Sequence, residues 1–277
     1  MSEVIVASDR LPARLIKPHT HEKFYLHRRY CSIFNSGMQK QWPRNRGYLE
    51  LFAGSGLAYD AITGAEHEAS PILAATLNSP GFSRLAFVEY DQELAHALEA
   101  RLRSRGIADG RARVFAGDAN DRYVLARALA FLPDPGLIFV FADPEDINFW
   151  WSSVQILAAA RRQRKDLMIN LPIGPMRREI GNRRYGSTAR FLGTNEWITQ
   201  AERGDDLGDL LRQTYADQLG TLGFTARHKA IHAATGNLVL YDLVFASRSP
   251  RALEFWHKIQ EIGVSGQREL KLFPDFE

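Results

Sequence analysis

The sequence predicts an α/β fold with a mostly parallel, Rossmann-like sheet. A short apolar strand runs directly into a glycine turn in Tyr48-Leu-Glu-Leu-Phe-Ala-Gly-Ser-Gly56, and two later apolar runs each end in an acid, Glu89 and Asp143. Apolar runs also alternate with segments of helical period, which is typical of a parallel sheet connected by helices. Because the carboxyl ends of such strands form the ligand crevice, we expect these glycines and acids at a site for a nucleotide-like molecule.

The elements follow in order along the chain. We expect seven strands, at residues 48–51, 85–88, 113–116, 137–142, 167–171, 225–233 and 238–246. Between most of them we expect helices, at residues 71–77, 92–105, 122–132, 150–164 and 207–222. Only residues 234–237 separate the last two strands, which is a hairpin length, so the last strand should be antiparallel. That topology is the one of class I methyltransferases that use S-adenosylmethionine (SAM).

Three further segments surround this domain, which we place at residues 47–262. Residues 1–46 are expected to form an N-terminal helical extension, with a helix over 18–36 that Gly37 stops. Residues 172–206 break the alternation and predict an insertion or lid after the fifth strand, because long connections inside compact domains are usually functional or disordered. Residues 263–277 are expected to be a C-terminal tail.

Composition excludes several classes of protein. The 277 residues are 45% hydrophobic and 24% charged, which suits one large core. The single cysteine, Cys31, excludes an internal disulfide and a cysteine-based zinc site, and we expect it to be a core thiol. The eight histidines lack a spacing such as H-E-x-x-H, so no metal is expected. No apolar run approaches the roughly 20 residues that span a bilayer, and the N-terminus is too polar for a signal peptide. We therefore expect a cytoplasmic protein without a membrane partner.

The glycine turn favours SAM over a dinucleotide. Gly54-Ser-Gly56 lacks the third glycine of the dinucleotide motif, and Glu89 lies further on than the acid of that motif. SAM carries no pyrophosphate, so it needs close backbone approach at the turn but no phosphate site. We expect the cofactor to be held by residues at the ends of the first three strands, namely Glu50, Phe52, Gly54, Gly56, Glu89, Tyr90, Asp118 and Ala119.

Each acid of this set has an expected role and an alternative. Glu89 is expected to accept both ribose hydroxyls, and its alternative is a helix-capping role shared with Asp91. Glu50 would be a buried acid in need of a partner, beside the methionine moiety. Asp118 is placed to accept a hydrogen bond from the adenine amino group, and its alternative is a cap for the helix that starts near Asp121.

Asp143 is the expected catalytic residue. Methyl transfer is an in-line displacement, so the enzyme mainly positions the acceptor and removes its proton. Asp143 closes the fourth strand, at the position nearest to the transferred methyl group in this fold. Asn170-Leu-Pro172 ends the fifth strand and is a further candidate for the lining of the substrate cleft.

Positive charge is concentrated in residues 161–190, which hold nine arginines or lysines and two acids, Asp166 and Glu179. Arginines bind phosphates through bidentate, charge-assisted contacts, so this segment indicates an RNA or DNA substrate. We expect Arg177, Arg178, Arg183 and Arg184 to bind that substrate. The alternative is a solvated helix face followed by a loop.

Short motifs along residues 18–262 resemble the three-Cys-motif partner proteins. The resemblance is carried by His19-Thr-His-Glu-Lys23, the glycine turn, Ser70-Pro-Ile-Leu73, Phe87-Val-Glu-Tyr-Asp91, Gly117-Asp-Ala-Asn120, Ala142-Asp-Pro144, Leu243-Val-Phe-Ala-Ser247 and Ala252-Leu-Glu-Phe-Trp256. That family is named for neighbouring radical-SAM-like proteins with three cysteines. The resemblance implies a SAM-methyltransferase-like fold and such a protein as a partner.

The chain departs from this pattern next to the expected catalytic residue. Glu145 and Asp146 follow Pro144 where the family has an aromatic residue and a glycine, and Ala69 replaces a glycine before Ser70. Amino-methyltransferases stack their target base on an aromatic ring after the Asp/Asn-Pro-Pro motif. Phe149, Trp150 and Trp151 are the nearest substitutes, and their alternative is a place in the core.

Three functions follow from these patterns. The first is a SAM-dependent methyltransferase acting on nucleic acid. The second is a partner protein that keeps the fold, with or without SAM, and works in a complex with the three-cysteine protein. Extra carboxylates at Glu145 and Asp146 favour this second function, because they repel a phosphate backbone. The third is a small-molecule methyltransferase, for which the basic segment is incidental.

Overall fold

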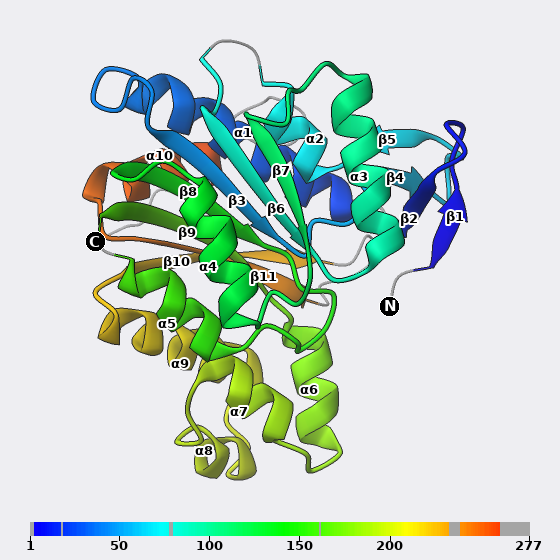
Figure 1. The fold of residues 1–277 in the computed structure, drawn as a ribbon. Coiled ribbons are helices and arrows are strands. Elements are labelled where there is room, and N and C mark those ends of the chain that lie inside the picture. Colours follow the sequence, from blue (N-terminus) through cyan, green and yellow to red (C-terminus); the bar gives the residue numbers. More distant parts are fainter. Residues whose placement is uncertain (1–2, 18, 78–79, 161, 233–238, 261–277) are drawn as a thin grey trace, which may run out of the picture.

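The computed structural model describes residues 3–17, 19–77, 80–160, 162–232 and 239–260 (Figure 1). In this part of the chain a seven-stranded sheet lies between two layers of helices, and a four-stranded sheet stands at one end. No helix in the described ranges is both long and apolar enough to cross a membrane.

The large sheet has the predicted topology. Its strands are β3 (Arg46–Leu51), β6 (Arg84–Glu89), β7 (Ala112–Ala116), β8 (Gly136–Ala142), β9 (Gln163–Leu171), β10 (Thr225–His232) and β11 (Val239–Ser247). They are ordered β10-β11-β9-β8-β3-β6-β7, and β11 runs antiparallel to both of its neighbours. The prediction of a class I SAM-methyltransferase fold with an antiparallel last strand is therefore confirmed. The predicted turn at 234–237 lies outside the described residues.

Alternate residues of the strands enter two separate cores. Tyr48 and Phe139 pack with helices α1 (His19–Met38), α2 (Ser70–Ala75), α3 (Gln92–Ser104) and α10 (Pro250–Gln260). Leu49 and Val140 point to the opposite face, as the period of two in a strand requires. There they pack with α4 (Arg122–Phe131), α5 (Trp151–Ala159) and α9 (Leu207–Thr221).

One predicted boundary is wrong, because α5 ends at Ala159 and β9 begins at Gln163. Polar residues at the start of β9 resembled an exposed helix end in the sequence. Two of them, Gln163 and Lys165, are buried, and their hydrogen bonds explain why: Gln163 Nε2 donates to the Leu129 carbonyl at 2.9 Å, and Lys165 Nζ donates to the Ala160 carbonyl at 3.1 Å.

The N-terminal segment is not wholly helical, which corrects the expectation for residues 1–46. It begins with β1 (Val4–Val6) and β2 (Pro12–Ile16), and only then enters α1. These strands join β4 (Leu57–Asp60) and β5 (Glu66–Glu68) in the small sheet, where β2 runs parallel to β4. Their partners come from the segment that follows the glycine turn, so the N-terminal residues belong to the same packed unit as the main domain.

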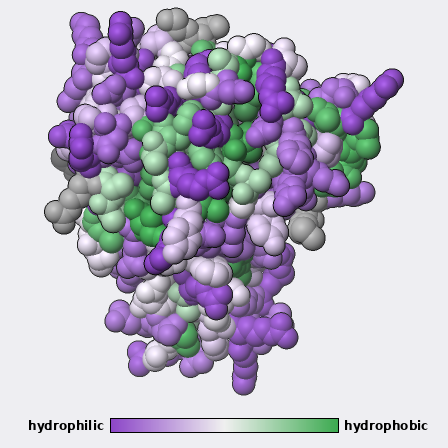
Figure 2. All heavy atoms as spheres, viewed as in Figure 1, coloured by the Kyte–Doolittle hydropathy of each residue, from purple (hydrophilic) through white to green (hydrophobic). Residues whose placement is uncertain are grey.

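Residues 172–206 form the predicted insertion between β9 and α9. It contains α6 (Ile173–Gly181), α7 (Gly186–Leu192) and α8 (Ile198–Glu202), which project from one end of the molecule (Figure 1). Met176, Phe191 and Trp197 anchor these helices in the core. Figure 2 shows a mostly hydrophilic surface over them. The predicted tail at 263–277 lies outside the described residues.

The glycine turn generates a test of packing. Gly56 has φ +81°, and a Cβ there would lie 2.8 Å from Leu98 Cδ1 and 2.9 Å from Ile72 Cγ1. We expect Gly56→Ala to lower the free energy of unfolding by about 2–4 kcal/mol, from left-handed strain and overpacking together. Urea unfolding followed by circular dichroism measures it.

Gly106→Ala is the matched control. Gly106 has φ +70°, and a Cβ there would meet no heavy atom of the described residues within 4 Å, so the loss in this variant reports strain alone. Equal losses in the two variants would contradict the packing argument.

Candidate functional site

The candidate site lies at the carboxyl ends of β3, β6 and β8, where the strand order reverses. From β3 the sheet continues to β6 on one side and to β8 on the other. Such a switch point is where ligands bind in open α/β sheets. The turn after β3 carries three left-handed residues, Phe52 (φ 64°), Gly54 (φ 65°) and Gly56 (φ 81°). A bulky side chain in this region is a strained exception, and such strain clusters at functional sites.

Glu89 joins the glycine turn to the neighbouring strand. Its buried carboxylate accepts a hydrogen bond from Gly54 N at 2.6 Å and from Asp91 N at 2.9 Å. Asp91 separately caps α3, since its side chain accepts from Glu93 N and Leu94 N. The two acids therefore divide the roles that the sequence left open: Asp91 is the cap and Glu89 faces the turn. Each Glu89 oxygen keeps a lone pair for a further donor.

Arg14, which sequence reasoning did not select, lies against this turn. It stands on β2, and its Nη2 is 3.6 Å from Glu89 while its Nη1 forms an ion pair with Glu145. A Cβ on Gly54 would lie 3.5 Å from Arg14 Nε. The guanidinium thus bridges Glu89, at the end of β6, and Glu145, after the end of β8, beside the expected cofactor site.

Glu50 lies in the middle of a buried hydrogen-bond network. Its carboxyl group accepts from Tyr48 Oη at 2.6 Å and from Ser70 Oγ at 2.5 Å, which are the partners that a buried acid needs. Burial raises the pKa of Glu50 to about 8, although both hydrogen bonds act to lower it. Tyr48 Oη also lies 2.8 Å from Nε2 of His27, whose pKa burial lowers to about 3. Cys31 is buried beside His27, as expected for a core thiol.

Asp143 is held by two residues. Its Oδ2 accepts from Lys23 Nζ at 2.5 Å, and its Oδ1 accepts from Asn170 Nδ2 at 2.9 Å. Lys23 belongs to α1, and its ammonium group lies 5.5 Å from the ring centroid of Tyr241. Sequence reasoning missed the role of Lys23, although the residue lies in the quoted motif His19–Lys23. Both Asp143 oxygens are engaged, so Lys23 and Asn170 belong to the site with it.

The other expected cofactor residues, Asp118, Ala119 and Tyr90, lie in different environments. Oδ1 of Asp118 accepts from Asn120 N at 2.8 Å and from Asn120 Nδ2 at 3.0 Å, while Asp121 caps α4. Ala119 is buried in the core. Tyr90 is 75% exposed, so its side chain points to solvent although Glu89 before it is buried.

The aromatic residues after Pro144 belong mostly to the core. Phe149 and Trp151 are buried, which supports the core alternative for both. Trp150 is half-buried, and the guanidinium of Arg190 lies 4.9 Å from its ring centroid.

The four arginines expected to bind the substrate do not all lie at one place. Arg178 and Arg184 line a cleft of about 560 Å³ together with Glu145 and Asp146. Arg177 instead lies 3.8 Å from Asp206, and Arg183 is exposed at a left-handed position (φ 53°).

Strand β9 also splits the larger basic segment. Arg164 is the second residue of β9 and lies eight residues before the insertion, which is about 26 Å at about 3.3 Å per residue, and Arg162 precedes the strand. The run of charge in the sequence is therefore not one surface patch.

Comparison with known proteins finds similarity to solved structures at low sequence identity. The chain matches no protein family model and no curated protein. Its structure is similar to the O-methyltransferase from Bacillus cereus in complex with SAH, with a TM-score of 0.45, 15% identity, and coverage of 84% of this chain and 81% of that one. It is also similar to magnesium protoporphyrin IX methyltransferase from Synechocystis PCC 6803 with bound SAM, with a TM-score of 0.41, 11% identity, and coverage of 84% and 85%. The fold assignment itself rests on the strand order and directions of this chain.

The Glu50 network predicts a pH dependence of stability. The folded-state pKa of about 8 lies above the ordinary value of 4.5, so the folded protein binds the extra proton between these pH values. The contribution of Glu50 to stability is therefore full below about pH 4.5 and is lost as the pH rises to 8. We expect the free energy of unfolding of wild type to fall relative to Glu50→Gln over pH 5–8, by up to about 1.4 kcal/mol per pH unit.

Urea unfolding monitored by tryptophan fluorescence at several pH values measures this difference. Asp166, whose pKa burial raises to about 6, is present in both proteins and cancels. Parallel stability curves for the two proteins would contradict the assignment.

Proposed function

We propose that the protein is a SAM-dependent methyltransferase. The observation that carries the proposal is the 2.6 Å hydrogen bond from Gly54 N to the buried carboxylate of Glu89. It holds the glycine turn of β3 and the acid of β6 against the same space, at the switch point of a sheet with class I methyltransferase topology. This pairing of Gly54 with Glu89 suits a ribose diol bound at Glu89 and an amino-acid moiety bound near the turn.

The residues at this edge fit the cofactor. Arg14 Nε and Asn170 Oδ1 are buried and have no hydrogen-bond partner among the described residues, so a donor and an acceptor remain for a ligand. Glu89 would hold the ribose, Gly54 and Glu50 the methionine end, and Asp118 the adenine. Arg14 would move away from Glu89 as the ribose hydroxyls take its place.

Bound SAM supplies an electrophilic methyl group on sulfur. This chain's own residues position the acceptor and handle its proton at Asp143, Lys23 and Asn170. Lys23 and Asn170 each donate one hydrogen bond to Asp143, so each Asp143 oxygen keeps a lone pair with which it would accept the proton.

Arg178 and Arg184 favour a nucleic acid as the acceptor, against the three acids that line the same cleft, Glu145, Asp146 and Glu179. Arg178 and Arg184 line the same space as Glu145 and Asp146, two and three residues after Asp143 at the expected methyl position. Glu179, also at this cleft, has its carboxylate engaged by Ser187 N and Thr188 N, so it competes less for the arginines. The two guanidinium groups would bind consecutive phosphates and present a base to Asp143.

A second function is favoured by the position of Arg14. If the Arg14 bridge between Glu89 and Glu145 persists, the ribose acceptor stays occupied and the chain keeps the fold without using SAM. It would then act as the partner of a three-cysteine radical-SAM-like protein, in line with the motifs that resemble the three-Cys-motif partner proteins.

Calorimetric titration with SAM and S-adenosylhomocysteine separates the two functions. We expect micromolar binding by wild type and a loss of at least about tenfold in Glu89→Gln, because one carboxylate oxygen becomes an amide donor. Glu93→Gln, on the exposed side of α3, is the matched control and should bind like wild type. Absence of binding by folded wild type would reject the methyltransferase and leave the partner function.

Fluorescence anisotropy with labelled single-stranded RNA and duplex DNA tests the acceptor. The double variant Arg178→Ala/Arg184→Ala should weaken binding and lower the slope of log affinity against log salt by about 1.4 for RNA, which corresponds to two phosphate contacts. Arg162→Ala/Arg164→Ala changes the same charge at the far end of β9 and should leave the slope unchanged. Equal slopes in both double variants would reject the cleft as the nucleic-acid site.

A further inference from the structure

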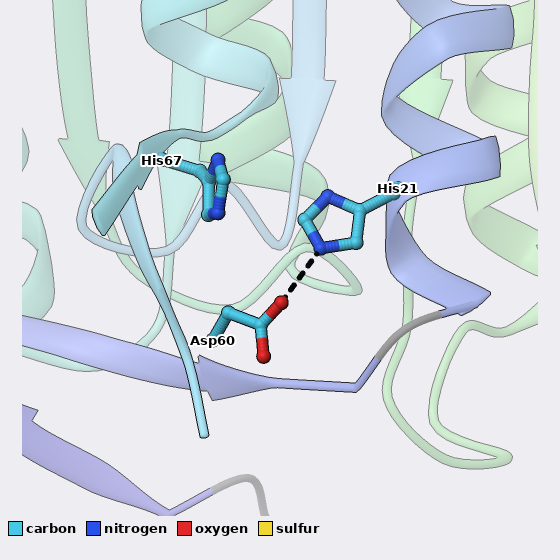
Figure 3. A group of neighbouring side chains, drawn as sticks. All are labelled: His21, Asp60 and His67. Carbon is cyan, nitrogen blue, oxygen red and sulfur yellow. Dashed lines mark hydrogen bonds and ion pairs between the residues drawn. The ribbon is translucent and has the colours of Figure 1, made fainter. Parts of the chain in front are cut away.

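We propose that His21, Asp60 and His67 bind a divalent transition-metal ion, with zinc as the ion that suits them best. The three side chains come from the first turn of α1, the end of β4 and the short strand β5, and they converge on one point (Figure 3). Their potential ligand atoms all lie within 4.8 Å of one another. This site is separate from the proposed cofactor and acceptor residues and does not depend on their function.

The spacing is close to that of a coordination shell. Two ligand atoms, each about 2.0–2.1 Å from a tetrahedral zinc ion, stand about 3.3 Å apart. His21 Nε2 and Asp60 Oδ2 are 3.0 Å apart, so this pair needs almost no adjustment. The widest pair would approach by about 1.5 Å to reach that spacing, which rotation of a histidine ring provides.

The carboxylate of Asp60 is already oriented. Its Oδ1 accepts hydrogen bonds from Ile62 N at 2.8 Å and Thr63 N at 3.2 Å, which leaves Oδ2 to face the histidines. Hydrogen bonds to a ligating carboxylate are the usual outer support of a metal site. Asp60 is buried, so its direction is fixed by the turn rather than by solvent.

His67 supplies an observation that hydrogen bonding does not explain. Its Nε2 is buried and lacks a hydrogen-bond partner within the described part of the chain. The ring lies edge-on to His21, with centroids 4.8 Å apart. A buried imidazole nitrogen without a partner normally carries a cost, and coordination to a metal ion satisfies it.

Ligand chemistry selects the ion. Two imidazoles and one carboxylate suit zinc and its neighbours in the first transition row, whereas magnesium and calcium take oxygen ligands. The His21 side chain is 36% exposed, which leaves a fourth position open to water. The simpler alternative is a His21–Asp60 hydrogen bond that only ties α1 to β4, and in that case His67 has no part in it.

Titration of untagged, chelator-treated protein with Co²⁺ and Zn²⁺ tests the proposal. We expect one equivalent of Co²⁺ to give the visible d–d absorption of a low-coordinate site, Zn²⁺ to displace it, and Zn²⁺ to raise the melting temperature. His67→Gln should weaken binding by at least about tenfold, and His21→Gln should do the same.

His96→Gln is the matched control, because His96 is exposed on α3 and is not a member of the cluster. It should bind like wild type. The proposal is overturned if wild type binds neither ion, or if binding survives in both His67→Gln and His21→Gln. Circular dichroism of each variant shows whether it is folded, and either histidine variant alone suffices if the other does not fold.

Discussion

Much of the arrangement depends on one carboxyl group, Glu50, in a strand whose six residues are all buried. A buried acid persists only where hydrogen bonds satisfy it, and the donors here are Tyr48 and Ser70. Ser70 begins α2, and Tyr48 in turn contacts His27 of α1, so this acid links the central strand to two helices. The glycine turn leaves β3 directly after this anchored position. The hydrogen bonds to Glu50 therefore also help to hold the glycine turn in position against Glu89.

The N-terminal segment completes the site rather than extending the fold. Arg14 of β2 reaches Glu89 and Glu145, and Lys23 of α1 reaches Asp143. Partly exposed ion pairs contribute little to stability, so their importance lies in placement. The two cations offset two of the three negative charges that this edge carries on Glu89, Glu145 and Asp143. A ribose bound at Glu89, as proposed, would compete with Arg14 for that carboxylate, and an acceptor bound at Asp143 would lie beside Lys23.

The sequence predicted those features that depend on continuous burial or on local hydrogen bonding along the chain. β8 is a continuous apolar run that is buried throughout, and Asp91 has the spacing of a cap, so both were predictable. Arg14 and Lys23 were not, because their partners lie far away in the chain and no periodicity connects them. Gly37 was expected to stop α1, and the helix ends one residue later, at Met38. A Cβ on Gly37 would also come within 2.6 Å of Phe255. Gly37 therefore allows α1 and α10 to pack closely, and this role can be recognised only in the tertiary structure.

The first turn of α1 contacts both sheets. His21 and Lys23 are two residues apart, and at about 100° per residue their side chains leave the helix in nearly opposite directions. His21 accordingly contacts Asp60 of the small sheet, while Lys23 contacts Asp143 at the edge of the large sheet. Any interaction that fixes His21 against Asp60, such as their hydrogen bond, also restricts the rotation of this turn. The position of Lys23 beside Asp143 thus depends on the small sheet, although Lys23 itself contacts Asp143 and Tyr241 of the large one.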